Sequence, residues 1–465
     1  TCCLPPGPSV GLEGADVLGG PAGRGAGVAA WMAIWWLTEA VHISVTALLP
    51  LAAFPVFGVR GMQEAATPYA NDLIYLFMGG FILSLSMQRW GLHRRIALTT
   101  LGFVGTKPTR VVGGFMGVTA VMSMWVSNTA TAVMMLPIAL SVLELNEGTD
   151  RFGVALLLGI AYGASIGGVG TIIGTPPNVF LASYLSESLG REISFGRWMT
   201  VGIPFVAVFL PIAWLMLTRF LFKVEEMSLE GGEELIAEEL EALGPMNRGE
   251  WVTLIVFVGA AVTWVVRSYV ADVTIGGVQP FAGLTDTGVA MVAAMVLFVT
   301  PAGEDDAFVM DWETARELPW GILILFGGGL SLAAAIDDTG IGAFLGTQVG
   351  VLEGVPGIFV VAILTALVVL LTELTSNTAT TATFLPILAG IAPGIGIDPM
   401  LLLVPAAMAA SCAFMLPVAT PPNAIVFGSG RISIPEMRSA GIWLNVISVG
   451  LITVSAYTLV LYLLV

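Results

Sequence analysis

Two short polar phrases recur in otherwise apolar surroundings. The first, SNTATAVMMLPI, begins at Ser127, and the second, SNTATTATFLPI, begins at Ser376, 249 residues later. A further pair, GTPPN at Gly174 and ATPPN at Ala419, recurs 245 residues apart. Ser, Thr and Asn side chains cap helix N-termini, which attract anions, and their oxygens can join backbone carbonyls around a small hard cation such as Na⁺. The four phrases therefore carry the chemistry of a site that takes an anion together with cations.

The SNT phrases lie near the centres of two oversized apolar segments, 111–145 and 357–392. A re-entrant hairpin explains both the length and the central polar tripeptide, because two half-helices of about 16 residues would meet roughly 24 Å deep. Irregular backbone at that depth must be buried in protein or line a cavity. Small polar residues can also serve only to pack membrane helices closely. Their recurrence at the centres of two segments that are too long for one crossing favours hairpin tips.

The TPPN phrases predict two broken helices, over 152–185 and 400–428. In the first, Thr175 can cap a helix whose first residue is Pro176, where the missing amide hydrogen costs nothing. The preceding residues, GASIGGVGTIIG, are too rich in glycine for an unbroken helix. Four helix breaks would then face one site, each with a positive N-terminal end and exposed carbonyls. No Lys or Arg lies in any of these motifs, so neutral dipoles and bound cations would have to hold the anion.

Composition defines the protein class that contains these segments. Of 465 residues, 56% are hydrophobic and 11% are charged, and apolar runs near 20 residues recur along most of the chain. This predicts an all-α polytopic membrane protein in the lipid bilayer; a soluble helical bundle would need polar stripes that most of the runs lack. The net charge of −16 argues against nucleic acid as a partner. Three cysteines and two histidines offer neither a disulfide framework nor metal-site spacing.

The chain is read as two copies joined by a linker. Besides the polar phrases, LFMGG at Leu76 recurs as LFGGG at Leu325, again 249 residues later. The linker contains nine glutamates, and its charge favours a solvated hinge over a short amphipathic helix. The expected divisions are an N-terminal tail at 1–26, a first repeat at 27–222, an acidic cytoplasmic linker at 223–250 and a second repeat at 251–465.

Loop charges predict that the two copies are inverted in the membrane. The segment from Arg89 to Arg110 has five of the 17 basic residues and no acid, which places it in the cytoplasm. The corresponding segment, 338–359, has Asp338 and Glu353 and no base. Corresponding loops on opposite sides require inverted-topology repeats, an architecture of many secondary transporters whose sites lie between the repeats.

Few ionisable groups lie within the apolar segments. Glu373, one turn before the second SNT phrase, could carry a proton or be a hydrogen-bonded structural carboxylate. Glu39 and His42 lie near a span end and are read as interfacial or structural. No nucleophile–base pair or metal-ligand cluster is evident, so an intramembrane enzyme is disfavoured.

The paired SNT and TPPN motifs, with WLTEAVHISVTALLP, resemble the divalent anion–sodium symporter family of carboxylate and sulfate transporters, over essentially residues 27–465. The resemblance implies a homodimeric elevator-type transporter, in which this chain has no counterpart of the family's first transmembrane helix. It also implies one Na⁺ site formed by Ser123, Ser127 and Asn128 with the backbone of Gly174, and another formed by Thr372, Thr375 and Asn377 with the backbone of Ala419. The substrate contacts that it implies are Asn128, Thr129, Thr175, Ser376, Asn377, Thr378 and Pro421.

These observations predict a Na⁺-coupled symporter for small dianionic C4-dicarboxylates such as succinate, malate or fumarate. A sulfate symporter or a dicarboxylate exchanger on the same fold remains the alternative, because neutral dipoles bind either anion. The expected location is a prokaryotic plasma membrane, which the chain crosses many times.

Overall fold

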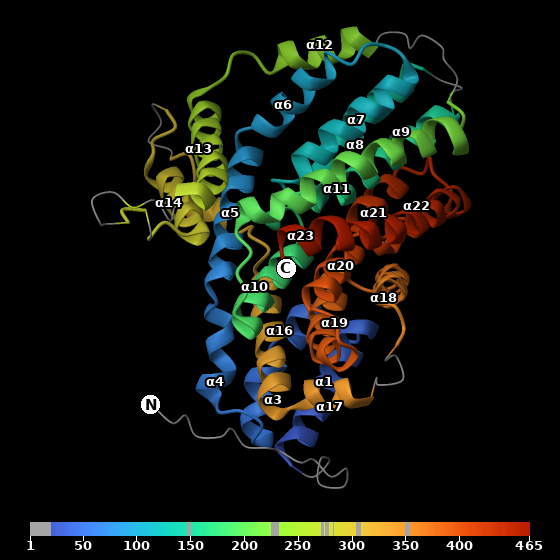
Figure 1. Ribbon diagram of the computed structural model, residues 1–465. Coiled ribbons are helices and arrows are strands. Elements are labelled where there is room, and N and C mark those ends of the chain that lie inside the picture. Colours follow the sequence, from blue (N-terminus) through green and yellow to red (C-terminus); the bar gives the residue numbers. More distant parts are fainter. Residues whose placement is uncertain are drawn as a thin grey trace.

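The computed structural model describes residues 20–465 except 147–149, 225–231, 271–273, 275–278, 282, 304–307 and 349–353. Within those residues the regular structure is helical, apart from one isolated bridge between Pro301 and Phe308. Seven of the described helices are long and apolar enough to cross a membrane. Figure 1 shows an elongated molecule in which α5 runs along most of the length. The chain is an all-helical, multi-pass membrane protein.

The first half follows the expected order of apolar segments. Its helix α1 begins at Pro21, so the expected tail over 1–26 is wrong for residues 21–26, and residues 1–19 lie outside the described part. A proline at the first helical position is favourable, which explains the earlier start. The main helices are α1 (Pro21–Thr38), α2 (Ile43–Thr46), α3 (Leu49–Phe57), α4 (Met62–Ala66), α5 (Asp72–Arg89), α6 (Leu92–Leu101), α7 (Pro108–Ser123), α8 (Asn128–Glu144), α9 (Asp150–Gly168), α10 (Pro176–Leu189) and α11 (Phe195–Leu215).

The second half, like the first, contains a pair of helices broken at an SNT phrase, then a helix broken before a TPPN phrase, then one long helix. Its main helices are α12 (Gly232–Ala242), α13 (Arg248–Val270), α14 (Asp286–Val299), α15 (Trp312–Ala315), α16 (Trp320–Thr339), α17 (Ile341–Gln348), α18 (Gly357–Thr372), α19 (Asn377–Ile391), α20 (Met400–Ala410), α21 (Pro421–Gly428), α22 (Ile434–Ser455) and α23 (Leu461–Leu463).

Each SNT phrase lies where one helix of a pair ends and the next begins. Pair α7/α8 breaks between Ser123 and Asn128, and pair α18/α19 breaks between Thr372 and Asn377. Each pair packs against the broken helix that follows it in the chain, α7 on α9 and α18 on α20. Glycine allows the first of these close approaches: a Cβ at Gly167 would lie 2.2 Å from the carbonyl oxygen of Ala120.

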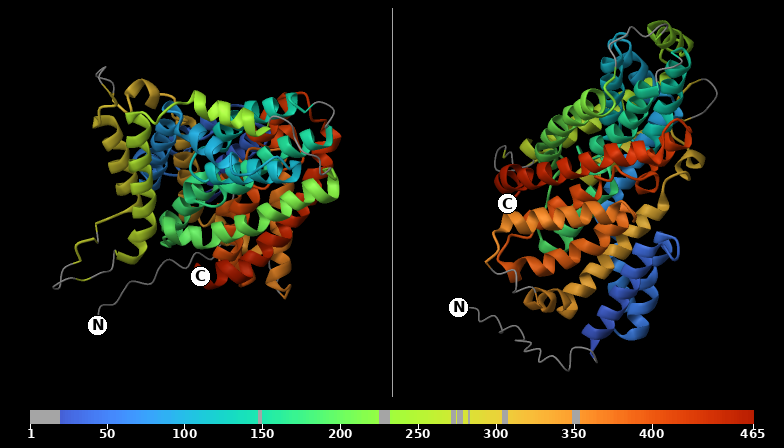
Figure 2. Two further views of the ribbon diagram at one scale, coloured as in Figure 1. Left: turned by 90° about the horizontal axis from the view of Figure 1, so that it is seen from above. Right: turned by 90° about the vertical axis from the view of Figure 1, so that its right-hand side faces the viewer.

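The second part of each broken helix crosses to the other half of the chain. Helix α10 packs on α19, and helix α21 packs on α8. The views in Figure 2 show the central helices of both halves packed together rather than as separate bodies. This exchange brings the ends of all four broken segments to one place.

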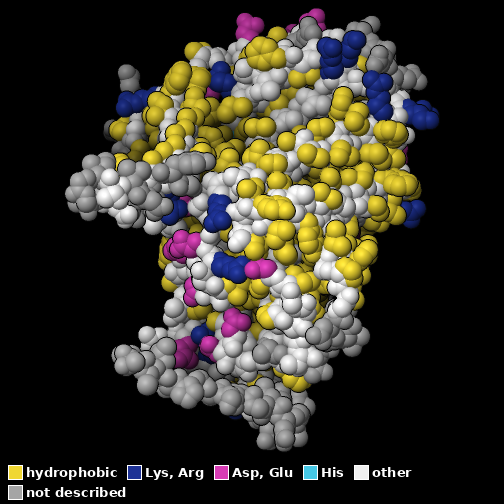
Figure 3. All heavy atoms as spheres, viewed as in Figure 1, with side chains coloured by type: hydrophobic (Ala, Val, Ile, Leu, Met, Phe, Trp, Pro, Cys, Tyr) yellow, Lys and Arg dark blue, Asp and Glu magenta, His cyan; other side chains and the backbone are white. Residues whose placement is uncertain are grey.

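Large apolar side chains cover much of the outer surface, as expected for contact with lipid. On α13 the exposed side chains include Trp251, Ile255 and Val262, and on α22 they include Val446 and Val454. Figure 3 shows hydrophobic side chains across the broad middle of one face and a group of Lys and Arg side chains at its upper end. That end carries α6 and α12 in the same view.

The acidic linker contains a helix rather than only the solvated hinge that its charge favours. Helix α12 packs on α6, and Arg94 of α6 forms an ion pair with Glu239. Leu235, Ile236 and Leu240 are partly buried against the apolar core. An apolar stripe at helical spacing, opposed by a basic helix, explains why the glutamates do not keep the segment extended.

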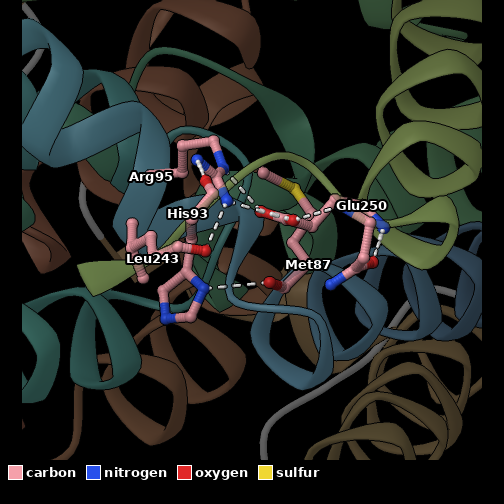
Figure 4. Close-up of polar contacts among 7 residues, drawn as sticks. Met87, His93, Arg95, Leu243 and Glu250 are labelled. Atoms are coloured by element: carbon pink, nitrogen blue, oxygen red, sulfur yellow. Dashed lines mark hydrogen bonds and ion pairs between the residues drawn. The ribbon is translucent and has the colours of Figure 1, made fainter. Parts of the chain in front are cut away.

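Behind this contact lies a buried polar cluster (Figure 4). The Arg95 guanidinium lies 2.7 Å from the Glu250 carboxylate and donates to the carbonyl of Gly244 at 2.8 Å. Burial lowers the pKa of His93, and the nearby Arg94 charge acts in the same direction. The ring nitrogen Nδ1 of His93 lies 2.9 Å from the carbonyl oxygen of Met87. The cluster fastens the end of the linker to α6.

Removing Arg95 should destabilise the protein far more than removing Arg94. The Glu250 side chain is only 3% exposed, so Arg95→Ala leaves a buried charge unpaired, at a cost of about 3–5 kcal/mol. The Arg94–Glu239 pair is more exposed, and Arg94→Ala should cost less than about 1 kcal/mol. Thermal unfolding of the two purified variants measures the difference. Equal shifts in Tm would show that the Arg95–Glu250 pair does not fasten the linker.

Candidate functional site

The four repeated motifs meet around one cavity of about 550 Å³. Every residue expected from the resemblance to contact substrate lines it, as do several expected for Na⁺. The lining residues from the motifs are Ser127, Asn128, Thr129, Gly174, Thr175, Pro176, Ser376, Asn377, Thr378, Ala419, Thr420, Pro421 and Pro422. Of the remaining residues expected for Na⁺, Ser123, Thr372 and Thr375 are not in the lining.

Serine side chains cap the two helices that begin at the SNT phrases. The Ser127 hydroxyl accepts a hydrogen bond from the N–H of Ala130 at 3.2 Å, and the Ser376 hydroxyl accepts one from Ala379 at 3.5 Å. The caps end the preceding turns and direct the first amides of α8 and α19 toward the cavity. Asn128 and Asn377 are the first residues of these helices.

The proline motifs place two more helix N-termini at the cavity. Pro176 and Pro421 are the first residues of α10 and α21. Thr420 caps α21 by accepting from the N–H of Asn423 at 3.3 Å. Thr175 holds the equivalent position but makes no capping hydrogen bond, because its hydroxyl lies 3.4 Å from the Ser411 hydroxyl instead.

Two asparagines that the sequence analysis did not place in the site hold the breaks open. The side-chain amide of Asn178 donates to the carbonyls of Gly168, at 3.3 Å, and Thr171, at 2.8 Å. The Asn423 amide donates to Ala413, at 3.3 Å, and Leu416, at 3.0 Å. Donors and acceptors in the two sets are each 245 residues apart.

These bonds satisfy carbonyls that a helix break leaves without partners. The signal for both residues was present in the sequence, as the last letter of the repeated TPPN motif. The role is structural: each asparagine fixes the backbone from which the cavity lining is made.

Near the first tip, the Asn128 side-chain amide and the Gly174 carbonyl oxygen lie close to Gly168. A methyl group at Gly168 would lie 2.8 Å from Asn128 Oδ1 and 3.1 Å from the carbonyl oxygen of Gly174. Asn128 Oδ1 is buried and has no hydrogen-bond partner among the described residues. Buried acceptors are rarely left unsatisfied, so this oxygen fits a ligand that the protein does not itself supply. Ser123 lies five residues before Asn128, and its hydroxyl donates to the carbonyl oxygen of Ala164 at 2.7 Å.

Near the second tip, the hydroxyls are occupied within the protein. Thr372 Oγ1 lies 2.6 Å from Asn377 Oδ1 and 2.9 Å from the carbonyl oxygen of Ala410. Thr375 Oγ1 lies 2.7 Å from Thr380 Oγ1. A cation at this tip would have to displace one of these contacts or share its oxygens.

Most of the remaining lining is apolar, and much of it comes from α5 and from the residues around the start of α16. It includes Phe77, Phe81 and Leu85 of α5 and Ile322 of α16. No Lys, Arg or His side chain is among the described residues that line the cavity. Because Gln88, next to the end of α5, also lines it, the cavity extends toward the segment that begins at Arg89. Any anion bound here meets helix N-termini and neutral dipoles rather than a basic side chain.

Glu373 is tied into the break of the second half by four donors. The N–H groups of Phe414, Met415 and Leu416 donate to its carboxylate at 2.7, 2.9 and 3.1 Å. The side-chain amide of Asn445 in α22 adds a fourth bond at 2.7 Å. Of the two alternatives left open by the sequence, this geometry supports a structural carboxylate, because every neighbour is a donor suited to the charged form.

Comparison with known proteins identifies close sequence relatives. A family described as the sodium:sulfate symporter transmembrane region matches residues 16–464. A sodium-dependent dicarboxylate transporter, SdcS, of Staphylococcus saprophyticus is 44% identical over 442 residues, which are 92% of this chain and 84% of the relative. SdcS of Staphylococcus aureus is 43% identical with the same coverage.

Two solved structures share the fold at low identity. The YdaH transporter of Alcanivorax borkumensis has a TM-score of 0.61 at 14% identity, covering 93% of this chain and 97% of that one. MtrF of Neisseria gonorrhoeae, described as one of a class of antimetabolite efflux pumps, has a TM-score of 0.61 at 13% identity, with coverages of 94% and 95%. At this identity the likeness concerns the helical fold alone.

Replacing the Glu373 carboxylate by an amide should destabilise the protein strongly. Glu373→Gln keeps the shape but turns one acceptor into a donor that faces N–H groups, which should cost about 2–4 kcal/mol. Glu436→Gln is the matched control, because this exposed carboxylate accepts its bonds from Ser433 at a helix N-terminus. The control should lose about 1 kcal/mol or less. Thermal unfolding compares the two, and a Glu373→Gln protein as stable as the control would rule out the structural role.

Proposed function

The chain belongs to the sodium:sulfate symporter family, and from this membership we propose that it is a Na⁺-coupled symporter of C4-dicarboxylates such as succinate, malate or fumarate. The observation that carries the proposal is the single cavity at which all four helix breaks meet without a basic side chain. Both SdcS relatives are named as sodium-dependent dicarboxylate transporters, not as enzymes.

The anion half of the proposal rests on the converging helix ends. Helices α8 and α19 begin at the two SNT tips, and α10 and α21 begin at the proline motifs. Each N-terminus carries about half a positive charge. The first amides of α8 and α19 can also donate to an anion, whereas α10 and α21 begin with two prolines that have no N–H. A dicarboxylate suits the pairing, with one carboxylate near each tip. Its contacts would be Asn128, Thr129, Thr175, Ser376, Asn377, Thr378 and Pro421.

The cation half rests on oxygens that have no proton donor. The unpartnered Asn128 Oδ1 and the Gly174 carbonyl oxygen are suited to Na⁺, a hard cation that prefers oxygen ligands. With neutral dipoles alone, two negative charges in a low-dielectric interior are poorly compensated, and bound Na⁺ supplies the missing positive charge. We place one Na⁺ at Ser123, Ser127, Asn128 and the Gly174 backbone, and another at Thr372, Thr375, Asn377 and the Ala419 backbone.

The proposed architecture is a pair of inverted repeats, 27–222 and 251–465, joined by a cytoplasmic linker. Pairs α7/α8 and α18/α19 would be re-entrant hairpins that enter from opposite sides, with the broken helices over 152–185 and 400–428 between them. The matched bonds of Asn178 and Asn423 support the repeat, and the opposite charges of 89–110 and 338–359 support the inversion. Movement as an elevator and assembly as a homodimer complete the proposal, in a prokaryotic plasma membrane.

In this orientation the cavity of the structure reaches toward the cytoplasmic side. Its lining includes Gln88, next to the basic loop, and Pro319, directly before α16. The described conformation therefore corresponds to the inward-facing state of the proposed cycle.

Sulfate transport is the second candidate, because the family description names it. Sulfate presents one compact dianion, whereas both SNT tips line the cavity, as a dicarboxylate with two separate charges would require. The distinction is made by measuring both anions in the same preparation.

Uptake of succinate into proteoliposomes should follow an imposed inward Na⁺ gradient and collapse when K⁺ replaces Na⁺ on both sides. Asn128→Ala and Asn377→Ala should abolish Na⁺-dependent uptake while the proteins still insert, because each removes a side-chain amide whose oxygen would bind the cation and whose NH₂ group would donate to the anion. Succinate uptake that needs preloaded dicarboxylate but no Na⁺ would make the protein an exchanger. Uptake of sulfate but not succinate would make it a sulfate carrier.

The first Na⁺ site can be tested without substitution of any proposed ligand. Gly168→Ala places a methyl group 2.8 Å from Asn128 Oδ1, which should displace the oxygen and weaken Na⁺ binding about tenfold or more, or about 1.4 kcal/mol. Gly117→Ala on α7 is the control, because a Cβ there has nothing within 4 Å. Thermal stabilisation as a function of Na⁺ concentration reports both affinities. An unchanged Na⁺ midpoint in folded Gly168→Ala protein would remove this site.

A further inference from the structure

One residue in the cavity lining has the same sign of charge as the proposed substrate. Glu317, three residues before α16, is the only ionisable side chain among the described residues that line the cavity. It is exposed, so it lies at the open side of the cavity rather than among the buried tips. A carboxylate in this position repels an anion, and the repulsion is strongest for any negative charge of the ligand that lies at the open side of the cavity.

The basic side chains near Glu317 are engaged elsewhere. Arg316 pairs with Glu313 at 2.8 Å, and Arg89 pairs with Asp311 at 2.6 Å and also donates to Thr314. Glu317 itself forms no ion pair within the described part of the chain. Its charge is therefore not cancelled by a neighbouring cation.

A ligand with three carboxylates would find no cationic side chain in the lining for its third negative charge. The proposed function puts one carboxylate near each SNT tip, so a third carboxylate is left to face the wall that comes from α5 and from the residues around the start of α16. That wall offers the aromatic side chains Phe77 and Phe81, the amide of Gln88 and the carboxylate of Glu317. Of these side chains, only that of Glu317 carries a charge, so only Glu317 would repel a carboxylate of the ligand more than an uncharged group of the same shape.

We propose that Glu317 is a specificity-determining residue that restricts the bound anion to two negative charges. This inference rests on the proposed function and adds a feature to it: dianions are accepted and tricarboxylates are rejected by repulsion at the open side of the cavity. Repulsion between single charges several ångströms apart near a protein surface corresponds to roughly a three- to tenfold loss of affinity. Because Glu317 is exposed, added salt weakens the repulsion.

The test compares two ligands of the same shape and different charge. Tricarballylate is a trianion that contains a succinate unit, and 2-(carbamoylmethyl)succinate keeps that unit but replaces one terminal carboxylate by an uncharged amide. Their dissociation constants are measured by calorimetry on the purified protein at pH 8 and fixed Na⁺, for the wild type and for E317Q. The control is E192Q, since Glu192 is also an exposed carboxylate but does not line the cavity.

In the wild type the trianion should bind more weakly than the amide. In E317Q the ratio of the two constants should fall roughly three- to tenfold, while E192Q should keep the wild-type ratio. Raising ionic strength with choline chloride at constant Na⁺ should reduce the wild-type ratio and leave that of E317Q nearly unchanged.

An unchanged ratio in E317Q overturns the proposal, as does an equal change in both constants, which would indicate an effect on Na⁺ or on the fold. Absence of binding by either ligand to every variant overturns it as well. Succinate uptake is measured in parallel with the same preparations. Loss of Na⁺-driven uptake in the wild type would refute the proposed symport without affecting the ratio, so the two failures are distinguishable.

Discussion

A helix that breaks inside an apolar interior leaves backbone N–H and C=O groups without partners, and much of this interior is arranged to satisfy them. The carbonyls at the end of α9 take the amide of Asn178, and those after α20 take the amide of Asn423. The N–H groups after α20 take the carboxylate of Glu373. Asn128 Oδ1, which lines the cavity, is left without a hydrogen-bond partner among the described residues. The site is thus formed by the groups at the helix breaks that the protein does not itself hydrogen-bond.

This constraint also explains why an anion site can lack basic side chains. A buried Lys or Arg would need its own partner during any part of a cycle in which the anion is absent, at a cost of several kcal/mol. Helix N-termini impose no such cost, since their amides are fixed and only partly charged. Cations that arrive with the anion can then supply the balancing charge and leave with it. Coupling to Na⁺ follows from the neutral lining rather than from a dedicated binding residue.

The sequence predicted the parts of this arrangement that are local. The recurrence of SNT and TPPN located both tips and both breaks, and every predicted substrate residue lines one cavity. The caps follow from residue type, as at Ser127 and Ser376. What the sequence could not predict are contacts between distant segments: α10 on α19, α21 on α8, and the three N–H groups that face Glu373. Helix α12 was not the favoured prediction for the linker, because its glutamates favour a solvated hinge. The helix that opposes them, α6, is distant in the sequence.

The two breaks keep the same geometry with different chemistry, which indicates what the fold requires. The first-half counterpart of Glu373, 249 residues earlier, is Met124. The backbone carbonyl of Met124 accepts a hydrogen bond from the Thr171 hydroxyl. In the first half, Trp198 of α11 braces the break by donating to Val169 at 2.9 Å. In the second half, Asn445 of α22 braces it through Glu373. Trp198 donates directly to a backbone carbonyl, whereas Asn445 donates to a carboxylate that in turn accepts from backbone amides. The two contacts therefore share neither residue type nor charge. What the halves share is that the last long helix of each fixes the break, and a break that is fixed from outside the cavity can hold its helix ends toward a ligand whether or not the ligand is bound.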